Sequence, residues 1–105
     1  MGRPDQCALI FVSPVVIGEL KYGAYLSADV IRHHKQIDDF LISCKIISLD
    51  ADTATVYGRI RADLKKQGRP IPENDIWIAA SAIRLDLPLF TTDKHFERIE
   101  GLALL

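Results

Sequence analysis

The chain has little cysteine and no pair of cysteines in a CxxC arrangement. Cys7 and Cys44 are its two cysteines, too few for a disulfide scaffold. We therefore expect both thiols to be reduced, as in a cytoplasmic protein. A zinc site is disfavoured as well, because the spacings of His33, His34, His95 and the cysteines match no standard zinc pattern.

Long apolar runs and an excess of one charge are also lacking. No stretch approaches the roughly 18 consecutive apolar residues of a membrane span, and the first residues, MGRPDQ, have no basic region leading into a signal-peptide core. The formal net charge is −1, so nucleic-acid binding would depend on a local basic patch. We expect no membrane association, and the composition excludes neither an enzyme nor a binding module.

Strand-like segments and helical patterns alternate along the chain. With 105 residues, 49% of them hydrophobic, we expect residues 1–105 to form a single domain. Strands are expected at 8–13, 45–49 and 88–92, and helical segments at 14–27, 29–43, 50–68, 73–85 and 93–98. This order favours an α/β fold with a mostly parallel sheet flanked by helices. Ligands of such sheets usually bind beyond the carboxyl ends of the strands.

Three acidic residues stand near strand ends or helix starts. Glu19 follows the first expected strand, Asp75 stands at the start of a buried helix, and Asp93 directly follows the strand at 88–92. Carboxylates brought together repel one another and normally need a bound cation or a shared proton. Oxygen ligands favour Mg²⁺ or Mn²⁺ over zinc. A metal so held can polarise a phosphate and activate a water molecule.

A purely structural interpretation of the same acids is equally open. Aspartates are ordinary helix caps, each worth about 1 kcal/mol, and Asp75 and Asp93 both stand at helix starts. Glu19 lies on a mostly apolar helix face, where it could pair with Lys21 or with an arginine elsewhere. The residues alone do not decide between caps and a metal site.

Three sequence blocks resemble the PIN-domain family, and most closely the VapC toxins of bacterial and archaeal toxin–antitoxin pairs. They are GELKYGA at 18–24, NDIWIAASAI at 74–83 and LPLFTTDKHFERIEGLAL at 87–104, in the order of the family. The resemblance implies a metal-dependent endoribonuclease with a three-layer-like PIN fold. It also implies an acidic pocket for Mg²⁺ or Mn²⁺, formed by Glu19, Asp75 and Asp93. Thr92 and Asn74 would support this pocket.

The chain departs from the family at its N-terminal end. PIN domains of this type begin with a central strand that ends in an Asp, whereas Asp5 is the only acid ahead of Glu19 and no apolar strand leads into it. We therefore expect a PIN-like domain that is N-terminally truncated, with the first, central strand missing. Two hypotheses follow: a ribonuclease whose pocket still binds metal, and a truncated or degenerate PIN domain that binds an antitoxin or itself.

The resemblance also implies partners. These are an RNA substrate, a second copy of the chain, and a small antitoxin whose C-terminal segment lies in a groove and presents a basic side chain to the acids. Candidate RNA contacts are the basic residues Lys21, Arg59, Arg61, Lys65, Lys66, Arg69, Lys94 and Arg98. Tyr22 and Trp77 are expected to be core or interface anchors rather than base-stacking platforms.

Overall fold

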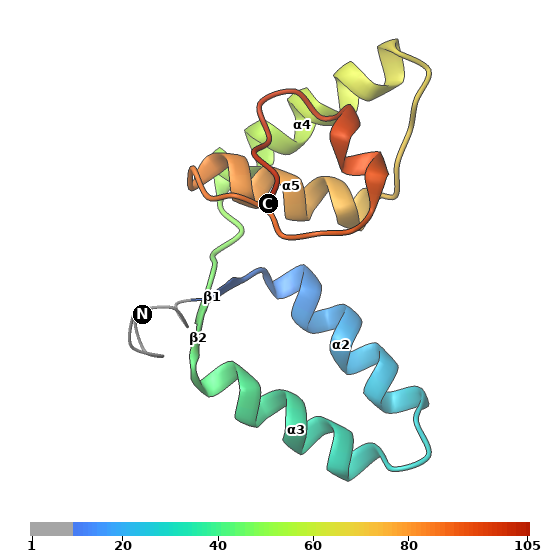
Figure 1. Ribbon diagram of the computed structural model, residues 1–105, viewed down its shortest axis with the longest axis vertical. Helices are drawn as coiled ribbons and strands as arrows, with labels where there is room; N and C mark the ends of the chain where they lie inside the picture. The colour runs from blue at the N-terminus through green and yellow to red at the C-terminus, as the bar shows by residue number, and fades with distance from the viewer. Residues whose placement is uncertain (1–9) are drawn as a thin grey trace. The chain divides into compact units, whose positions relative to one another are not determined.

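The computed structural model describes residues 10–105. Asp5, Cys7 and the first two residues of the strand expected at 8–13 lie outside the described residues. The chain divides into two compact units, the first ending at Ser48 and the second comprising Leu49–Leu105 (Figure 1). The expectation of a single domain stays a prediction. No helix within residues 10–105 is long and apolar enough to cross a membrane.

The first unit contains two short parallel strands and a pair of helices. Strand β1 is Ile10–Val12 and β2 is Cys44–Ile46, while helix α2 is Pro14–Leu26 and α3 is Val30–Ile42. The strand register pairs Ile10 with Cys44, Phe11 with Lys45 and Val12 with Ile46. Helices α2 and α3 lie side by side, joined by a tight turn (Figure 1). The predicted α/β class with parallel strand pairing is confirmed.

Local side-chain caps determine where the helices of the first unit begin. Ser13 Oγ accepts a hydrogen bond from the Val15 N–H at 3.1 Å, and Pro14 occupies the first turn. Asp29 Oδ1 accepts from the Arg32 N–H at 3.1 Å at the start of α3. Both helix starts agree with the sequence-based expectation, because the capping residue is adjacent to the turn it stabilises.

The second unit is built around two helices that pack closely. Helix α4 is Ala51–Lys66, α5 is Glu73–Arg84, and a 3₁₀ segment, η1, is Lys94–Arg98. The buried core consists of Ile60, Leu64, Ile76, Ala79, Ala80, Phe96 and Ile99. Ala79 and Ala80 are fully buried, and their small side chains let α4 approach α5 closely. As expected from its apolar residues, α5 is buried on more than one side.

The segment after α5 differs from the expected strand at 88–92. A single parallel bridge joins Leu89 to Leu104, with the Leu89 N–H donating to the Ala103 carbonyl at 2.9 Å and the Leu105 N–H donating to the Leu89 carbonyl at 3.0 Å. Pro88 has no N–H to extend such a ladder. Within the described residues, the strand is therefore much shorter than its apolar pattern predicted.

Helix α4 begins at a well-formed aspartate cap. Asp50 Oδ1 accepts hydrogen bonds from the Thr53 N–H at 2.9 Å and from the Thr53 hydroxyl at 2.8 Å. Asp50 Oδ2 lies 3.3 Å from Arg84 Nη2, at the end of α5. The hydrogen bonds from Thr53, with a smaller contribution from the Arg84 guanidinium, hold the pKa of the Asp50 carboxyl below its ordinary value.

This lowered pKa makes stability depend on pH. The Asp50 carboxylate stabilises the folded chain above the unfolded-state pKa of about 3.9, and the contribution is lost as the pH falls through the lower folded-state pKa. Since Asn keeps a capping oxygen, we expect Asp50→Asn to lower the melting temperature at about pH 7 more than below about pH 3. Thermal unfolding of both proteins at the two pH values measures this. An equal difference at both would contradict it.

Candidate functional site

Asp75 stands in the first turn of α5 but does not cap it. The N-cap position is occupied by Pro72, which makes no side-chain capping hydrogen bond. Asp75 is the third residue of the helix, and its side chain is 20% exposed. The carboxylate is favoured by the positive end of the helix dipole and is still accessible from one side. Asp75 therefore does not cap α5, although the sequence left that role open.

Asp93 immediately precedes η1 and likewise makes no capping bond with its side chain. Its own N–H donates to Thr91 Oγ1 at 3.1 Å. The hydroxyl that holds the Asp93 backbone is thus that of Thr91, a residue not singled out from the sequence; a threonine two residues before an aspartate was the available signal. Thr92, which was expected to support the site, is exposed, and its role stays a prediction.

The other aspartates and serines at helix starts behave differently. Ser13, Asp29 and Asp50 each accept a hydrogen bond from an N–H of the helix that follows. Asp75 and Asp93, which the sequence offered as caps, leave their carboxylates out of this bonding. Their side chains make no salt bridge to lysine or arginine within residues 10–105 either. These two carboxylates are therefore not accounted for by helix capping or by ion pairing with Lys or Arg.

His95 contacts Asp75 and brings the segment that begins with Asp93 to the start of α5. His95 Nε2 lies 2.9 Å from Asp75 Oδ2, and the imidazole is 25% exposed. This nitrogen is buried, and within the described part of the chain it makes no hydrogen bond of regular geometry. Its contact with the Asp75 carboxylate is an ion pair when the imidazole is protonated. From the sequence, His95 was considered only as a zinc ligand. Asp75 and His95 are twenty residues apart in the sequence, so no local sequence pattern could have predicted their contact.

Glu19 belongs to the other unit. Glu19 lies in α2 and is exposed, whereas Asp75 and Asp93 belong to the second unit. Among residues 10–105, no three or more His, Cys, Asp or Glu side chains form a group that could hold a metal ion. His95 contacts Asp75 and follows Asp93 by two residues in the chain, and Asn74 is exposed beside Asp75. The donor chemistry of this pair, carboxylate oxygens only, fits a hard divalent cation.

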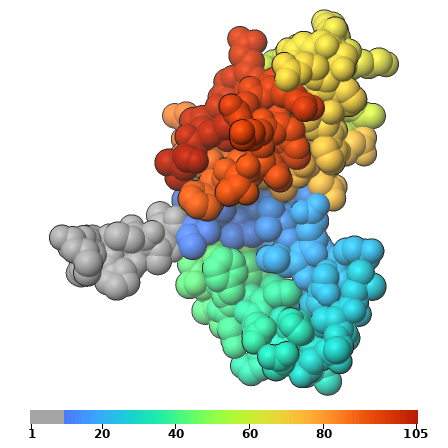
Figure 2. Space-filling view, turned by 45° about the vertical axis from the view of Figure 1, so that its right-hand side comes forward, coloured from blue at the N-terminus to red at the C-terminus, as the bar shows by residue number. Residues whose placement is uncertain are grey.

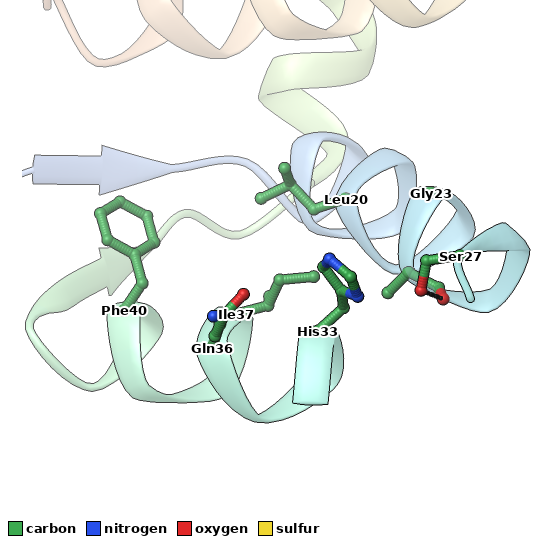
Figure 3. A pocket seen from close by; sticks show the side chains of 8 residues that line it. Leu20, Gly23, Ser27, His33, Gln36, Ile37 and Phe40 are labelled. Carbon is green, nitrogen blue, oxygen red and sulfur yellow. Dashed lines mark hydrogen bonds between the residues drawn. The ribbon is translucent and has the colours of Figure 1, made fainter. Parts of the chain in front are cut away.

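A second feature lies in the first unit, where α2 and α3 enclose a groove of about 550 Å³. Leu20, Gly23, Ala24 and Ser27 line it from α2, and His33, Gln36, Ile37 and Phe40 line it from α3 (Figure 3). Leu20 is 40% exposed and Phe40 is 46% exposed. Phe40 forms one wall of this groove. We call these eight residues the α2–α3 groove.

Comparison with known proteins assigns the family. The architecture is an α/β fold with parallel strands and two carboxylates at the helix starts of its second unit. The PIN-domain family model matches residues 4–102. The chain belongs to the PIN-domain family.

Its relatives include ribonucleases of the VapC type. Ribonuclease VapC2 of Rickettsia felis is 35% identical over 96 residues, which cover 90% of this chain and 72% of that protein. The tRNA(fMet)-specific endonuclease VapC of Shigella flexneri is 38% identical over 92 residues, covering 87% of this chain and 70% of that protein. The crystal structure of VapBC2 from Rickettsia felis bound to a promoter DNA fragment matches with a TM-score of 0.89 at 32% identity, over 97% of this chain and 77% of that one.

Proposed function

We propose that the chain is a metal-dependent endoribonuclease of the VapC type that cleaves RNA phosphodiester bonds. Asp75 and Asp93 are the principal ligands of Mg²⁺ or Mn²⁺, and Glu19 is a further ligand or the base that positions the attacking water. Thr92 and Asn74 support the pocket. The observation that carries the proposal is the pair of carboxylates in family motifs that make no capping bond and pair with no lysine or arginine within residues 10–105.

The chain's own residues perform three tasks in this mechanism. The first turn of α5 fixes the backbone of Asp75, and the Thr91 hydroxyl fixes that of Asp93. His95, when protonated, offsets the negative charge of Asp75. A bound divalent cation would supply the polarisation of the phosphate and the lowered pKa of a water ligand. Glu19, as a carboxylate, is suited to accept a proton from that water.

Metal removal tests the proposal directly. We expect the purified chain to cleave structured RNA with Mn²⁺ or Mg²⁺ present, to lose this activity in EDTA, and to regain it when Mn²⁺ is restored, because carboxylates alone cannot stabilise the charge that develops on the phosphate. Gel analysis of a labelled transfer RNA measures cleavage. Cleavage that persists unchanged in EDTA, or no cleavage with either metal, would contradict the proposal.

The α2–α3 groove favours a second candidate, a binding module for a small antitoxin or for another copy of the chain. An exposed apolar groove between two helices is a common docking site for an amphipathic segment. The similar structures of VapBC complexes support an antitoxin as the partner. We propose that the chain acts in the cytoplasm, forms a homodimer and binds such an antitoxin. If the purified chain binds an antitoxin but cleaves no RNA with Mn²⁺, it acts as a binding module and not as a nuclease.

A further inference from the structure

A basic pocket of about 350 Å³ lies in the second unit, lined by Arg69, Lys94, His95, Glu97 and Arg98. These five residues are called the basic pocket below. Arg69 comes from the loop between α4 and α5, and the others come from η1. The two segments lie side by side in Figure 2, the loop in yellow and η1 in orange-red. Arg98 Nη1 donates to the Pro70 carbonyl at 3.4 Å and so ties η1 to the loop.

The cations of this pocket differ from three other basic residues that the sequence offered as RNA contacts. Two more, Lys65 and Lys66, also make no salt bridge within residues 10–105, but they do not line the pocket. Lys21 pairs with Asp38, Arg59 with Asp63 and Arg61 with Glu73, so their charges are already matched by carboxylates. In contrast, Arg69, Lys94 and Arg98 make no salt bridge within residues 10–105. Three cations face one carboxylate, that of Glu97, in this lining. The pocket therefore carries an excess of positive charge that invites an anion.

The pocket is contiguous with the candidate carboxylates. His95 lines the pocket and also places its Nε2 against Asp75 Oδ2. Lys94 directly follows Asp93 in the chain. His95 thus links the lining of the pocket to Asp75 through one side-chain contact.

We propose that the basic pocket binds a backbone phosphate of RNA, next to the phosphate that is cleaved. This inference rests on the proposed function, because an RNA strand places a second phosphate beside any phosphate that reaches Asp75. Arg69 and Arg98 present guanidinium groups suited to bidentate contact with phosphate oxygens, and Lys94 adds a compact charge. The pocket holds the strand in register while the carboxylates act on the neighbouring linkage.

Equilibrium RNA binding without metal tests this proposal separately from cleavage. The probe is a fluorescein-labelled single-stranded RNA of about twelve nucleotides of mixed sequence, followed by anisotropy in EDTA over a series of salt concentrations. We expect Lys94→Ala and Arg98→Ala each to weaken binding about tenfold at low salt. The slope of log affinity against log salt should become shallower by about 0.7 for each RNA phosphate that the variant no longer neutralises.

Matched variants exclude a folding effect. Arg98→Lys keeps the charge and should retain most of the salt slope, and Lys94→Ala leaves the hydrogen bond between Arg98 and the loop in place. Arg32→Ala, which removes an exposed guanidinium of α3 outside the pocket, should leave binding unchanged. Circular dichroism confirms that each variant is folded. Equal affinity and equal slope for wild type and Lys94→Ala, or no RNA binding by the wild type, would overturn the proposal.

Two further outcomes separate the possible explanations. Inorganic phosphate, titrated at constant ionic strength, should displace the RNA no better than sulfate does; saturation of the pocket by millimolar phosphate would show a free-anion site and overturn the proposal. RNA binding that depends on Lys94 and Arg98, in a wild-type chain that cleaves nothing with Mn²⁺, would refute the proposed nuclease and support the phosphate site.

Discussion

Asp75→Asn is expected to reduce Mn²⁺-dependent RNA cleavage by at least about 100-fold while leaving the fold intact. The substitution keeps the size of the side chain but replaces an anionic oxygen by an amide nitrogen, which weakens a principal metal ligand. The effect on folding should be less than about 1 kcal/mol, the usual range for a carboxylate in the first turn of a helix. Initial rates under excess Mn²⁺, with a thermal melt of each protein, measure both quantities.

Asp52→Asn is the matched control for this experiment. Asp52 also stands in the first turn of a helix, α4, where its side chain is 78% exposed and lies 3.7 Å from Arg84. If the importance of Asp75 came only from the helix dipole, the two substitutions would have similar consequences. We expect the Asp52→Asn variant to cleave RNA at the wild-type rate. Equal activity of Asp75→Asn and wild type would remove Asp75 from the site.

Leu64→Ala is expected to cost about 3 kcal/mol of unfolding free energy, the largest stability effect we foresee. Leu64 is 2% exposed and belongs to the cluster between α4 and α5. Truncation removes buried methyl groups and leaves a cavity that closely packed helices cannot close. Urea unfolding, followed by the helical circular dichroism signal, gives the free energy. A decrease of less than about 1 kcal/mol would show that the interface can collapse around the cavity.

Ile31→Ala provides the comparison for the core substitution. Ile31 is 85% exposed on α3, so truncation there removes little buried surface. Alanine also favours the helix more than isoleucine does. We expect a change within about 0.5 kcal/mol, which would show that burial rather than the loss of an aliphatic side chain controls the larger effect.

The parts of the fold that the sequence predicted are those that depend on neighbouring residues. The helices expected to start near residues 14, 29 and 50 begin next to the caps Ser13, Asp29 and Asp50. The third of these helices ends close to its expected end, just before Gly68, whose φ of 68° is typical of a residue that ends a helix. The prediction of a strand at 88–92 was wrong because it depended on residues distant in the sequence. Strand extent depends on which distant segment pairs with it, and among residues 10–105 Leu89 is the one residue of this segment that is bridged.

The candidate site shows the same division. The carboxylates of Asp75 and Asp93 were found from their motifs, and the position of Asp75 at a helix start was correct. Their bonding was not predictable, because the choice of Pro72 over Asn74 or Asp75 as the N-cap depends on the local backbone. The contact of His95 with Asp75 depends on the packing of η1 against α5, for which the sequence carries no periodic signal.

The uncapped start of α5 has an evolutionary consequence. Within the described part of the chain, three helices gain stability from the side chain of their N-cap residue, and the helix that carries Asp75 does not. A capping residue in place of Pro72 is worth about 1 kcal/mol in many proteins, so a lineage under thermal selection has an accessible improvement at this position. Persistence of the proline across descendants would then indicate that something other than side-chain capping constrains this helix start.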